Sequence, residues 1–353
     1  EELGLTPDMI KTKEAEKLSG QDREELIKLH LQNAIEVLEE NTSVFNTHDL
    51  LSTAGALGMR HGIDTQEYIP YLTKNKELVD LSKGYYTTKT ILANEKELIE
   101  AVKETNAEKA FENTLSKKEI RERLEKYNEG QKYALNKGQM ESVELILNSI
   151  EQIIGIQGDA GTGKTSMLKA LNSIKNSDTK IIGLSYTGKA AKEIELKTEA
   201  ERMALSSEIM EQSGIKSRTV ASFLESIESE KIKKEDYKDS IIIVDESSFL
   251  GTKDASKLVS FAKESGAKIV KMGAEKQMKA INAGDPFRLL KHHAEMKTAN
   301  MDEVLRQETP ELKHAVKLLN EYKAVEALEY LDKKGMIHEL VVSEEVNDKR
   351  EAI

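Results

Sequence analysis

The stretch that decides the fold is residues 153–165, IIGIQGDAGTGKT. A short β-branched run, 153–156, precedes a glycine-rich loop, and the residues after the loop, 166–171, favour a helix. The loop fits the pattern G-x-x-x-x-G-K-[ST], in which backbone N–H groups at a helix N-terminus hold phosphates. Strand, loop and helix in this order predict a phosphate-binding α/β fold.

The loop predicts a complete set of contacts to ATP. Its glycines allow the backbone to approach the phosphates, Lys164 would reach the β- and γ-phosphates, and Thr165 would bind Mg²⁺. A glycine-rich turn with an ordinary lysine is the alternative. The predicted nucleotide-binding residues of the loop are Gly158, Asp159, Ala160, Gly161, Thr162, Gly163, Lys164, Thr165 and Ser166.

A second apolar run, 241–244, ends in Asp245 and Glu246. In parallel sheets the ligand lies at the carboxyl ends of the strands, so both carboxylates are expected beside the loop. Asp245 would hold Mg²⁺ through water, and Glu246 would orient or deprotonate the attacking water. The acid pair favours ATP hydrolysis over a kinase reaction. Guanine specificity is not expected, because the sequence contains no Asn-Lys-x-Asp run.

Four short β-branched runs, at 153–156, 180–184, 241–244 and 268–272, alternate with helical stretches. This alternation is typical of a parallel sheet with crossover helices. We therefore predict an α/β domain over residues 129–310.

The residues before this domain have a different composition and a different hydrophobic pattern. Residues 1–28 are expected to form a tail or a peripheral helix, and residues 93–128, rich in Glu, Lys and Arg, a helical linker. Between them, 29–92 predicts three helices, from about His30, Thr47 and Thr65, and a hairpin of 78–81 with 85–88. This is the outline of a small winged-helix-like α+β domain.

The wing of that domain would carry Lys83, Tyr85, Tyr86 and Lys89, a basic and aromatic mixture suited to nucleic acid. A small packing domain with its tyrosines in the core explains the pattern equally well. At the other end, residues 311–353 are expected to be the helical start of a following domain.

Composition limits the class of protein. With 353 residues, 38% hydrophobic and 33% charged, the chain suits two or three water-soluble domains. The absence of cysteine excludes disulfides and thiolate zinc sites, and with no signal segment or membrane span we expect a cytoplasmic protein without membrane insertion. A net charge of −11 argues against a general nucleic-acid coat. A local groove remains open, because residues 271–297 include Lys271, Lys276, Lys279, Arg288, Lys291 and Lys297.

The order of motifs resembles the RecD-like branch of superfamily 1 helicases, and more narrowly the motor of TraI-type conjugative relaxase-helicases. The stretches that carry the resemblance lie between residues 130 and 330; they are 136–139, 186–191, 219–224, 245–248, 273–277, 283–288 and 304–307. Residues 32–92 are similar to the winged segment that precedes the motor in that family. The resemblance implies a RecA-like P-loop NTPase fold, ATP and Mg²⁺ as cofactors, and single-stranded DNA and conjugation proteins as partners.

The resemblance also assigns roles to individual residues. It implies that Gln139 reads adenine, and that Gln277 and Arg306 approach the γ-phosphate as further catalytic residues beside Lys164, Asp245 and Glu246. The residues that it implies for single-stranded DNA are Thr187, Lys189, Thr219 and Phe223, and a place in the core is an equally good explanation for the aromatic Phe223.

Two departures weaken the expectation of full activity. Ala274 replaces the Asp of the family's Gly-Asp-x-x-Gln motif, and the chain ends at Ile353 before a second RecA-like domain is completed. We therefore expect a fragment that binds ATP and hydrolyses it slowly. The alternatives are a nucleotide-binding, catalytically weak DNA-binding or scaffold fragment, and an unrelated P-loop ATPase, which would not explain Gln139 or Arg306. The seven scattered histidines suggest no metal ligands.

Overall fold

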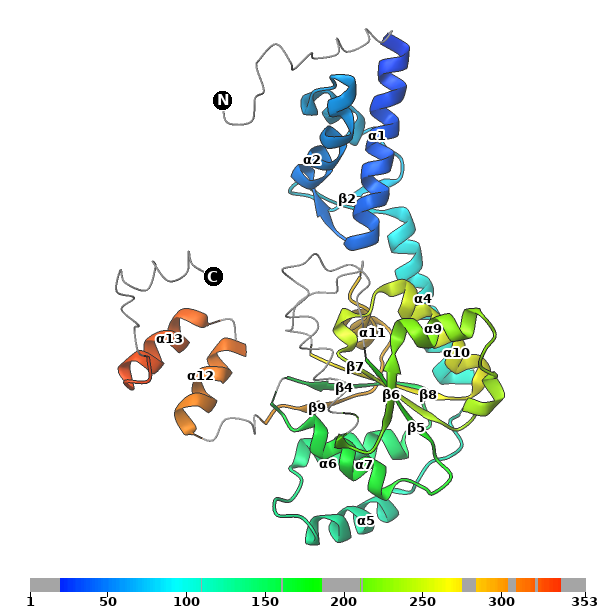
Figure 1. Ribbon diagram of the computed structural model, residues 1–353, viewed down its shortest axis with the longest axis vertical. Helices are drawn as coiled ribbons and strands as arrows, with labels where there is room; N and C mark the ends of the chain where they lie inside the picture. Colours follow the sequence, from blue (N-terminus) through cyan, green and yellow to red (C-terminus); the bar gives the residue numbers. More distant parts are fainter. Residues whose placement is uncertain are drawn as a thin grey trace, which may run out of the picture.

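The computed structural model describes residues 20–108, 110–159, 161–185, 210, 212–274, 284–303, 309–320 and 323–337. Figure 1 shows an N-terminal domain, an α/β domain built on a twisted sheet, and a pair of C-terminal helices. The α/β domain is called the motor domain below, after the resemblance that predicts this role for it. Among the helices of these ranges, none has the length and apolar character that a membrane span requires.

The N-terminal domain packs helices on a small antiparallel sheet in the order β1-β3-β2. Its helices are α1 (Gly20–Asn41), α2 (Thr47–Gly58) and the short α3 (Ile69–Leu72), with 3-10 turns at Met59–His61 and Thr65–Tyr68. The strands are β1 (Phe45–Asn46), β2 (Leu78–Asp80) and β3 (Tyr85–Thr88). The hairpin of β2 and β3 forms as expected from the sequence, and β1 adds a strand that the sequence did not predict.

The first helix extends further than its apolar pattern suggested. It begins at Gly20, so the expected boundary at residues 28–29 falls inside α1. Leu31, Ala34 and Ile35 face a core that also contains Phe45 and Tyr68. Of the residues predicted to lie on the wing, Lys83 and Tyr85 are exposed, whereas Tyr86 is partly buried against this core.

The segment expected to be a linker belongs to the motor. Helix α4 (Lys89–Glu108) inserts Leu98 and Val102 into one core cluster of the motor domain, while Ile91 at its start lies in the N-terminal core. Helix α5 (Lys117–Glu129) likewise buries Ile120 and Leu124 in the other cluster. The abundance of charge in 93–128 reflects helices with one solvated face, which a linker and a covering layer share.

The motor sheet has six parallel strands in the order β6-β5-β7-β8-β4-β9. Their bounds are β4 (Ile153–Gly158), β5 (Ile181–Ser185), β6 (Lys216–Thr219), β7 (Ile241–Asp245), β8 (Lys268–Gly273) and β9 (Thr298–Met301). The four predicted strands are confirmed. The two that the sequence missed, β6 and β9, form the edges of the sheet, where no continuous apolar run is needed.

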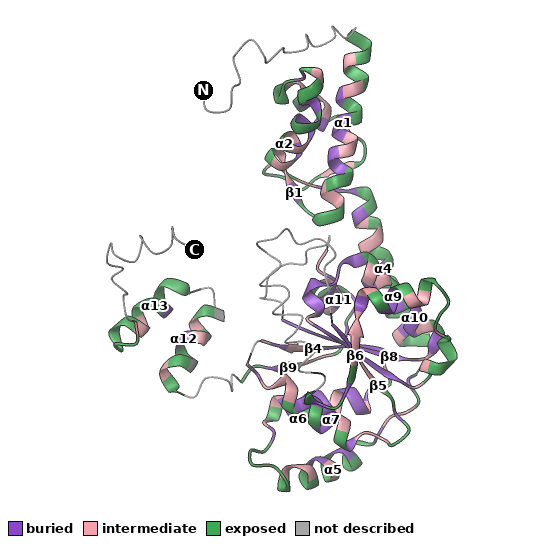
Figure 2. Cartoon of the chain, in the orientation of Figure 1, coloured by how far each residue is buried: buried purple, intermediate pink, exposed green. Residues whose placement is uncertain are grey.

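Helices cover both faces of this sheet. One face carries α5, α6 (Lys137–Asn148) and α7 (Lys164–Ile174). The other carries α4, α9 (Val220–Glu228), α10 (Thr252–Ser265) and α11 (Pro286–His293). Figure 2 shows the central strands as buried between these layers. Short 3-10 turns at Lys234–Tyr237 and Ser247–Phe249 complete the domain.

Beyond the motor lie α12 (Pro310–Asn320) and α13 (Ala324–Lys333), which pack against each other. The prediction of helices in this part of the chain agrees with them.

Candidate nucleotide-binding and catalytic site

The sheet brings the glycine-rich loop and the acidic pair to the same edge. The loop follows β4 and Asp245 ends β7, with β8 between these two strands. Two strand spacings separate β4 from β7 by roughly 10 Å. Helix α7 begins at Lys164 directly after the loop. The Nζ atom of Lys164 lies 3.6 Å from Asp245 Oδ1. The sequence prediction that these two residues share a site therefore agrees with the geometry.

The loop takes conformations that glycine allows. Gly161 and Gly163 have φ of +85° and +83°, which a side chain would disfavour. Gly163 is also the N-cap of α7 and supplies no side-chain cap, so the first N–H groups of the helix have no side-chain acceptor from that position. Thr162 is buried and its Oγ1 donates to Asp159 O at 2.9 Å. Ala160 lies outside the described residues.

Gln139 has a structural contact that the sequence did not reveal. Its side chain is 2% exposed, its Nε2 donates to Gly163 O at 3.0 Å, and its Oε1 accepts from Asn136 N at 2.9 Å. The start of α6 is thereby tied to the phosphate-binding loop. The capping pair Asn136-x-x-Gln139 is visible in the sequence, but its link to the loop is not. Adenine recognition by Gln139 stays a prediction.

The acidic pair occupies a sharp turn. Asp245 is 1% exposed, and Glu246 has φ +49° and ψ +39°. The Glu246 N–H donates to Asp245 Oδ1 at 2.9 Å. A left-handed residue directly after a strand redirects the chain, so the two carboxylates can face different parts of one ligand. This arrangement suits one carboxylate near a metal and the other near water.

Two contacts between segments distant in sequence support the loop and the start of α7. Lys291 of α11 donates to Gln157 Oε1, one residue before Gly158. Ser213 Oγ donates to Thr165 O at 3.3 Å. Neither Lys291 nor Ser213 could be assigned from sequence, because no local pattern marks a partner about 130 or 50 residues away.

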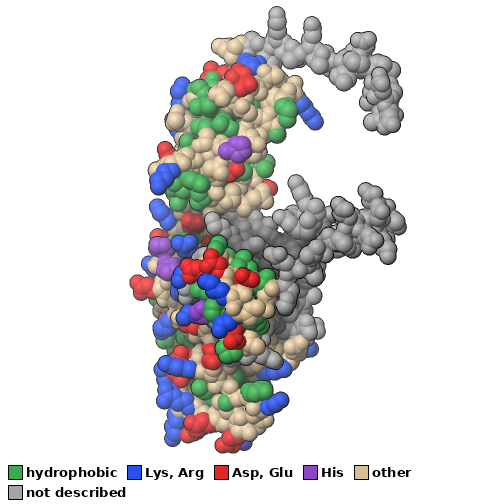
Figure 3. Space-filling view, turned by 90° about the vertical axis from the view of Figure 1, so that its left-hand side faces the viewer, with side chains coloured by type: hydrophobic (Ala, Val, Ile, Leu, Met, Phe, Trp, Pro, Cys, Tyr) green, Lys and Arg blue, Asp and Glu red, His purple; other side chains and the backbone are tan. Residues whose placement is uncertain are grey.

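The locally basic segment 271–297 does not form one surface. Lys271 is buried, Lys291 is partly buried and bound to Gln157, and Lys297 pairs with Glu151 at 2.9 Å. Only Arg288 is exposed without such a contact, while Lys276 and Lys279 lie outside the described residues. Figure 3 shows positive and negative side chains interspersed over the face that it presents.

Several buried polar atoms near the site have no hydrogen-bond partner within the described ranges. They belong to Ser247, Ser248, Thr252 and Lys271. A Cβ on Gly273 would lie 3.0 Å from Ser247 Oγ, and one on Gly284 would lie 2.1 Å from Thr252 Oγ1. The polar groups therefore pack tightly around the carboxyl ends of β7 and β8. Burial lowers the pKa of Lys271 to about 7, although the charge of Asp285 raises it.

The residues predicted to bind DNA have mixed outcomes. Thr219 caps α9, with its Oγ1 accepting from Ser222 N at 3.0 Å. Phe223 is fully buried, with edge-on contacts to Phe261 and Tyr237, and offers no face to a base. Its prediction as a DNA contact is wrong for this physical reason. Thr187 and Lys189, like the catalytic candidates Gln277 and Arg306, lie outside the described residues.

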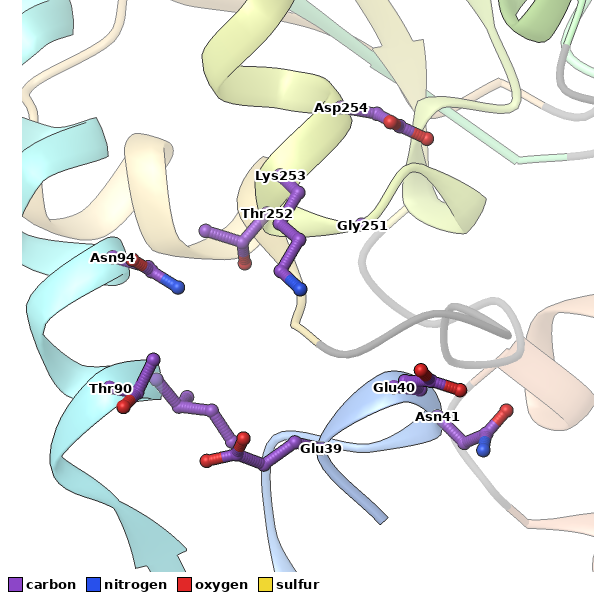
Figure 4. Close-up of a pocket in the computed structure, with 10 residues that line it drawn as sticks. Glu39, Glu40, Asn41, Thr90, Asn94, Gly251, Thr252, Lys253 and Asp254 are labelled. Atoms are coloured by element: carbon purple, nitrogen blue, oxygen red, sulfur yellow. The ribbon is translucent and has the colours of Figure 1, made fainter. Parts of the chain in front are cut away.

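A cavity of about 370 Å³ separates the N-terminal domain from α10. Figure 4 shows Lys253 and Asn94 pointing into it, with Glu39 at the end of α1 on the opposite side. Gly251, which also lines the cavity, follows Glu246 by one 3-10 turn. The part of the cavity lining that α10 supplies is therefore close in sequence to the acidic pair.

A family model described as an AAA domain matches residues 134–341, more than half of the chain. The chain belongs to this AAA domain family. Two curated relatives are multifunctional conjugation proteins TraI of Escherichia coli. One, from strain K12, is 30% identical over 189 residues, covering 52% of this chain and 10% of the relative; the other is 26% identical over 303 residues, covering 82% and 16%.

A third relative is a probable conjugal transfer protein TraA of Sinorhizobium fredii, 31% identical over 141 residues, or 40% of this chain and 11% of the relative. The chain spans about a sixth or less of the length of its TraI relatives. Among solved structures, Bacteroides Pif1 bound to single-stranded DNA has a TM-score of 0.38 at 18% identity, covering 59% of this chain and 51% of that one.

Proposed function

We propose that this motor domain binds ATP with Mg²⁺ and uses its hydrolysis to move along single-stranded DNA, as part of conjugative DNA transfer in the cytoplasm. The observation that carries the proposal is the 3.6 Å approach of Lys164 to Asp245 across the carboxyl edge of the sheet. A phosphate-binding cation and a metal-binding carboxylate at one point are what a nucleotide site requires.

Each residue has a role in this proposal. Lys164 binds the β- and γ-phosphates, and the N-terminus of α7 with the loop N–H groups surrounds them. Thr165 and Asp245 would hold Mg²⁺, which when bound would neutralise charge on the phosphates and orient them. Glu246 accepts a proton from the attacking water or orients it. Gln277 and Arg306 are the proposed sensors of the γ-phosphate, and Gln139 a contact to adenine.

Single-stranded DNA is proposed to cross the ends of β5 and β6. Thr187 and Lys189 follow β5, and Thr219 ends β6. These two strands are neighbours in the sheet, so their carboxyl ends, Ser185 and Thr219, lie side by side. A DNA path there would pass beside Asp245, because β7 is the other neighbour of β5. The exposed Lys83 and Tyr85 of the N-terminal hairpin are a second candidate contact.

An alternative function is a nucleotide-binding DNA scaffold with little turnover. Ala274 favours it, because this buried methyl group at the end of β8 occupies the position where the family motif has a carboxylate. A methyl group carries no charge that could report the state of a phosphate to the DNA.

A steady-state ATPase titration with single-stranded DNA separates the two functions. The proposed motor predicts that DNA stimulates hydrolysis and that Lys189→Ala together with Thr219→Ala weakens the stimulation. ATP binding without stimulation at saturating DNA would favour the scaffold. If the protein did not bind MgATP at all, both proposed functions would be refuted.

A further inference from the structure

Gln139 lies between two parts of the motor domain that are distant in sequence. It is the third residue of α6, and its side chain is buried against Gly163, 24 residues later. Burying an amide group costs free energy unless its donor and its acceptor are both bonded. The partners of this amide therefore show what the side chain is placed to hold.

The two ends of the Gln139 amide bind different segments. Its Oε1 accepts from Asn136 N at 2.9 Å, which closes a capping box at the start of α6. Its Nε2 donates to Gly163 O at 3.0 Å, and Thr162 O lies 3.5 Å away, at the limit of a hydrogen bond. The oxygen end thus stabilises the helix, and the nitrogen end stabilises the loop.

The start of α6 is a firm support for this contact. A Cβ on Gly138 would lie 2.7 Å from Asn300 O, so the helix begins directly against the backbone of β9. Strand β9 pairs with β4 in a register that places Met301 beside Gly158, the first glycine of the loop. The loop is therefore held at its beginning by β4 and at its end by a helix that rests on the neighbouring strand.

The bond to Gly163 O sets the direction of the next peptide N–H group. In a planar trans peptide the C=O group and the following N–H group point in opposite directions, and the described residues contain no cis peptide. Gly163 O accepts from Gln139 Nε2 and from Met167 N, at 3.0 and 3.1 Å. The Lys164 N–H group therefore points away from both donors. At the N-terminus of a helix such N–H groups are the donors that bind phosphate.

Gly163 is a residue whose backbone benefits from a restraint. Its φ of +83° is accessible because it has no side chain, and for the same reason its backbone has more freedom than that of other residues. A hydrogen bond to its carbonyl group limits that freedom before a ligand arrives. Donors that are ordered in advance bind a ligand at a lower cost in entropy.

We propose that Gln139 is a positioning residue for the phosphate-binding loop, which holds the peptide between Gly163 and Lys164 so that its N–H group faces a phosphate. This inference rests on the proposed function, in which the loop binds a nucleoside triphosphate. It goes beyond the adenine contact proposed for Gln139, because a residue that orients the loop affects phosphate binding whatever base the ligand carries.

Isothermal titration of the full chain with MgATP, MgGTP and magnesium tripolyphosphate, which has no base, tests this role. Gln139→Met should weaken all three ligands by the same factor, about fivefold, because one hydrogen bond that orders the loop is lost. The ratio of the ATP and GTP affinities should stay unchanged. A loss confined to MgATP would show that Gln139 acts on adenine alone and would overturn the proposal.

Glu119→Met is the matched control. Glu119 is the third residue of α5, where it closes a capping box with Ser116 in the same way as Gln139 does with Asn136. Loss of the capping box should lower the urea midpoint of both variants, but Glu119→Met should bind tripolyphosphate as the wild type does. If Gln139→Met also bound it with unchanged affinity, Gln139 would be a helix cap only, and the positioning role would be wrong.

Gln139→Glu separates the two ends of the amide and decides the question if Gln139→Met does not fold. Its carboxylate can still accept from Asn136 N, but it has no donor for Gly163 O. At high ionic strength, which screens repulsion between the new carboxylate and phosphate, it should bind tripolyphosphate about fivefold more weakly than the wild type. Wild-type affinity in this variant would contradict the proposal.

The wild type distinguishes failure of this role from failure of the nucleotide site. If the wild type binds MgATP and both Gln139 variants bind it equally well, only the positioning role is refuted. If the wild type binds none of the three ligands, the nucleotide site is refuted as well.

Discussion

Lys268 and Lys271 lie three residues apart on β8, yet their surroundings differ. At the amino edge, Lys268 donates to Ile146 O and Ser149 O, at 2.7 and 2.6 Å, and lies 4.1 Å from the centre of the Phe111 ring. Toward the carboxyl edge, Lys271 is equally buried and has no hydrogen-bond partner among the described residues. Burial lowers the pKa of each to about 7.

Unpartnered buried polar atoms are not confined to one edge. Among the described residues, Ser247, Ser248 and Thr252 carry them near the carboxyl edge, and Gln152 and Ser240 carry them near the amino edge. Unpaired buried polar groups cost stability. The contrast is therefore local to the two lysines: Lys268 is bound to two backbone carbonyl oxygens, whereas Lys271 has no such bond.

The largest expected effect is at the carboxyl edge itself. Lys164→Ala should weaken binding of MgATP about 100-fold, because it removes the side-chain cation beside the phosphates. Lys169→Ala is the matched control, since Lys169 is an exposed lysine of the same helix. Fluorescence titration with a labelled ATP analogue measures both. Equal affinities for the two variants would refute the nucleotide site.

Replacing each buried lysine by methionine should give stability changes of opposite sign. Lys271→Met removes an unpartnered buried amine and should raise the free energy of unfolding by about 1–3 kcal/mol at pH 7. Lys268→Met leaves two carbonyl oxygens unbonded and should lower it by about 1–3 kcal/mol. Urea denaturation followed by circular dichroism decides. Changes of the same sign would contradict the comparison.

Two glycines with positive φ allow a finer comparison of the edges. Gly284, at φ +109°, would place a Cβ 2.1 Å from Thr252 Oγ1, whereas Gly266, at φ +77°, would place one 3.7 Å from Lys238 Cγ. Both alanine variants are strained, but only Gly284→Ala also clashes. It should therefore cost about 1 kcal/mol more in unfolding free energy than Gly266→Ala. Equal costs would show that the Thr252 side chain moves freely.

The last comparison concerns pH. The folded-state pKa of Lys271, about 7, is below its ordinary value of 10.5, so above pH 7 the unfolded state binds more protons. The cost of burying the charged Lys271 ammonium group is fully present below pH 7. The free energy of unfolding should therefore rise as the pH increases from 7 toward 10. In Lys271→Met the slope of unfolding free energy between pH 7 and 9 should fall by about 1 kcal/mol per pH unit. Parallel curves for the two proteins would exclude this role.

The central strands and the phosphate-binding loop could be predicted because their signals are local. Strands such as β7 are buried on both faces and so consist of consecutive apolar residues. Edge strands β6, Lys-Ser-Arg-Thr, and β9, Thr-Ala-Asn-Met, lack this requirement and were missed. The conformation of the loop could likewise be predicted, because glycine is the residue type that adopts positive φ without strain.

Contacts between distant segments could not be predicted. Gln139 reaches Gly163, and Lys291 reaches Gln157 across two layers of the fold, and no spacing along the chain encodes either pair. Phe223 failed for a related reason. An aromatic residue after a strand has the same sequence pattern whether it stacks on a base or packs against Phe261.

The position of α4 has a consequence for dissecting the molecule. This single helix contributes Ile91 to the N-terminal core and Leu98 and Val102 to the motor core. A truncation within it therefore exposes apolar surface on one side or the other, and a protease would find no extended segment there to cut. Expression of either half alone should yield aggregation-prone material unless the whole of Lys89–Glu108 is retained with the motor and Ile91 is replaced by a polar residue in the excised N-terminal piece.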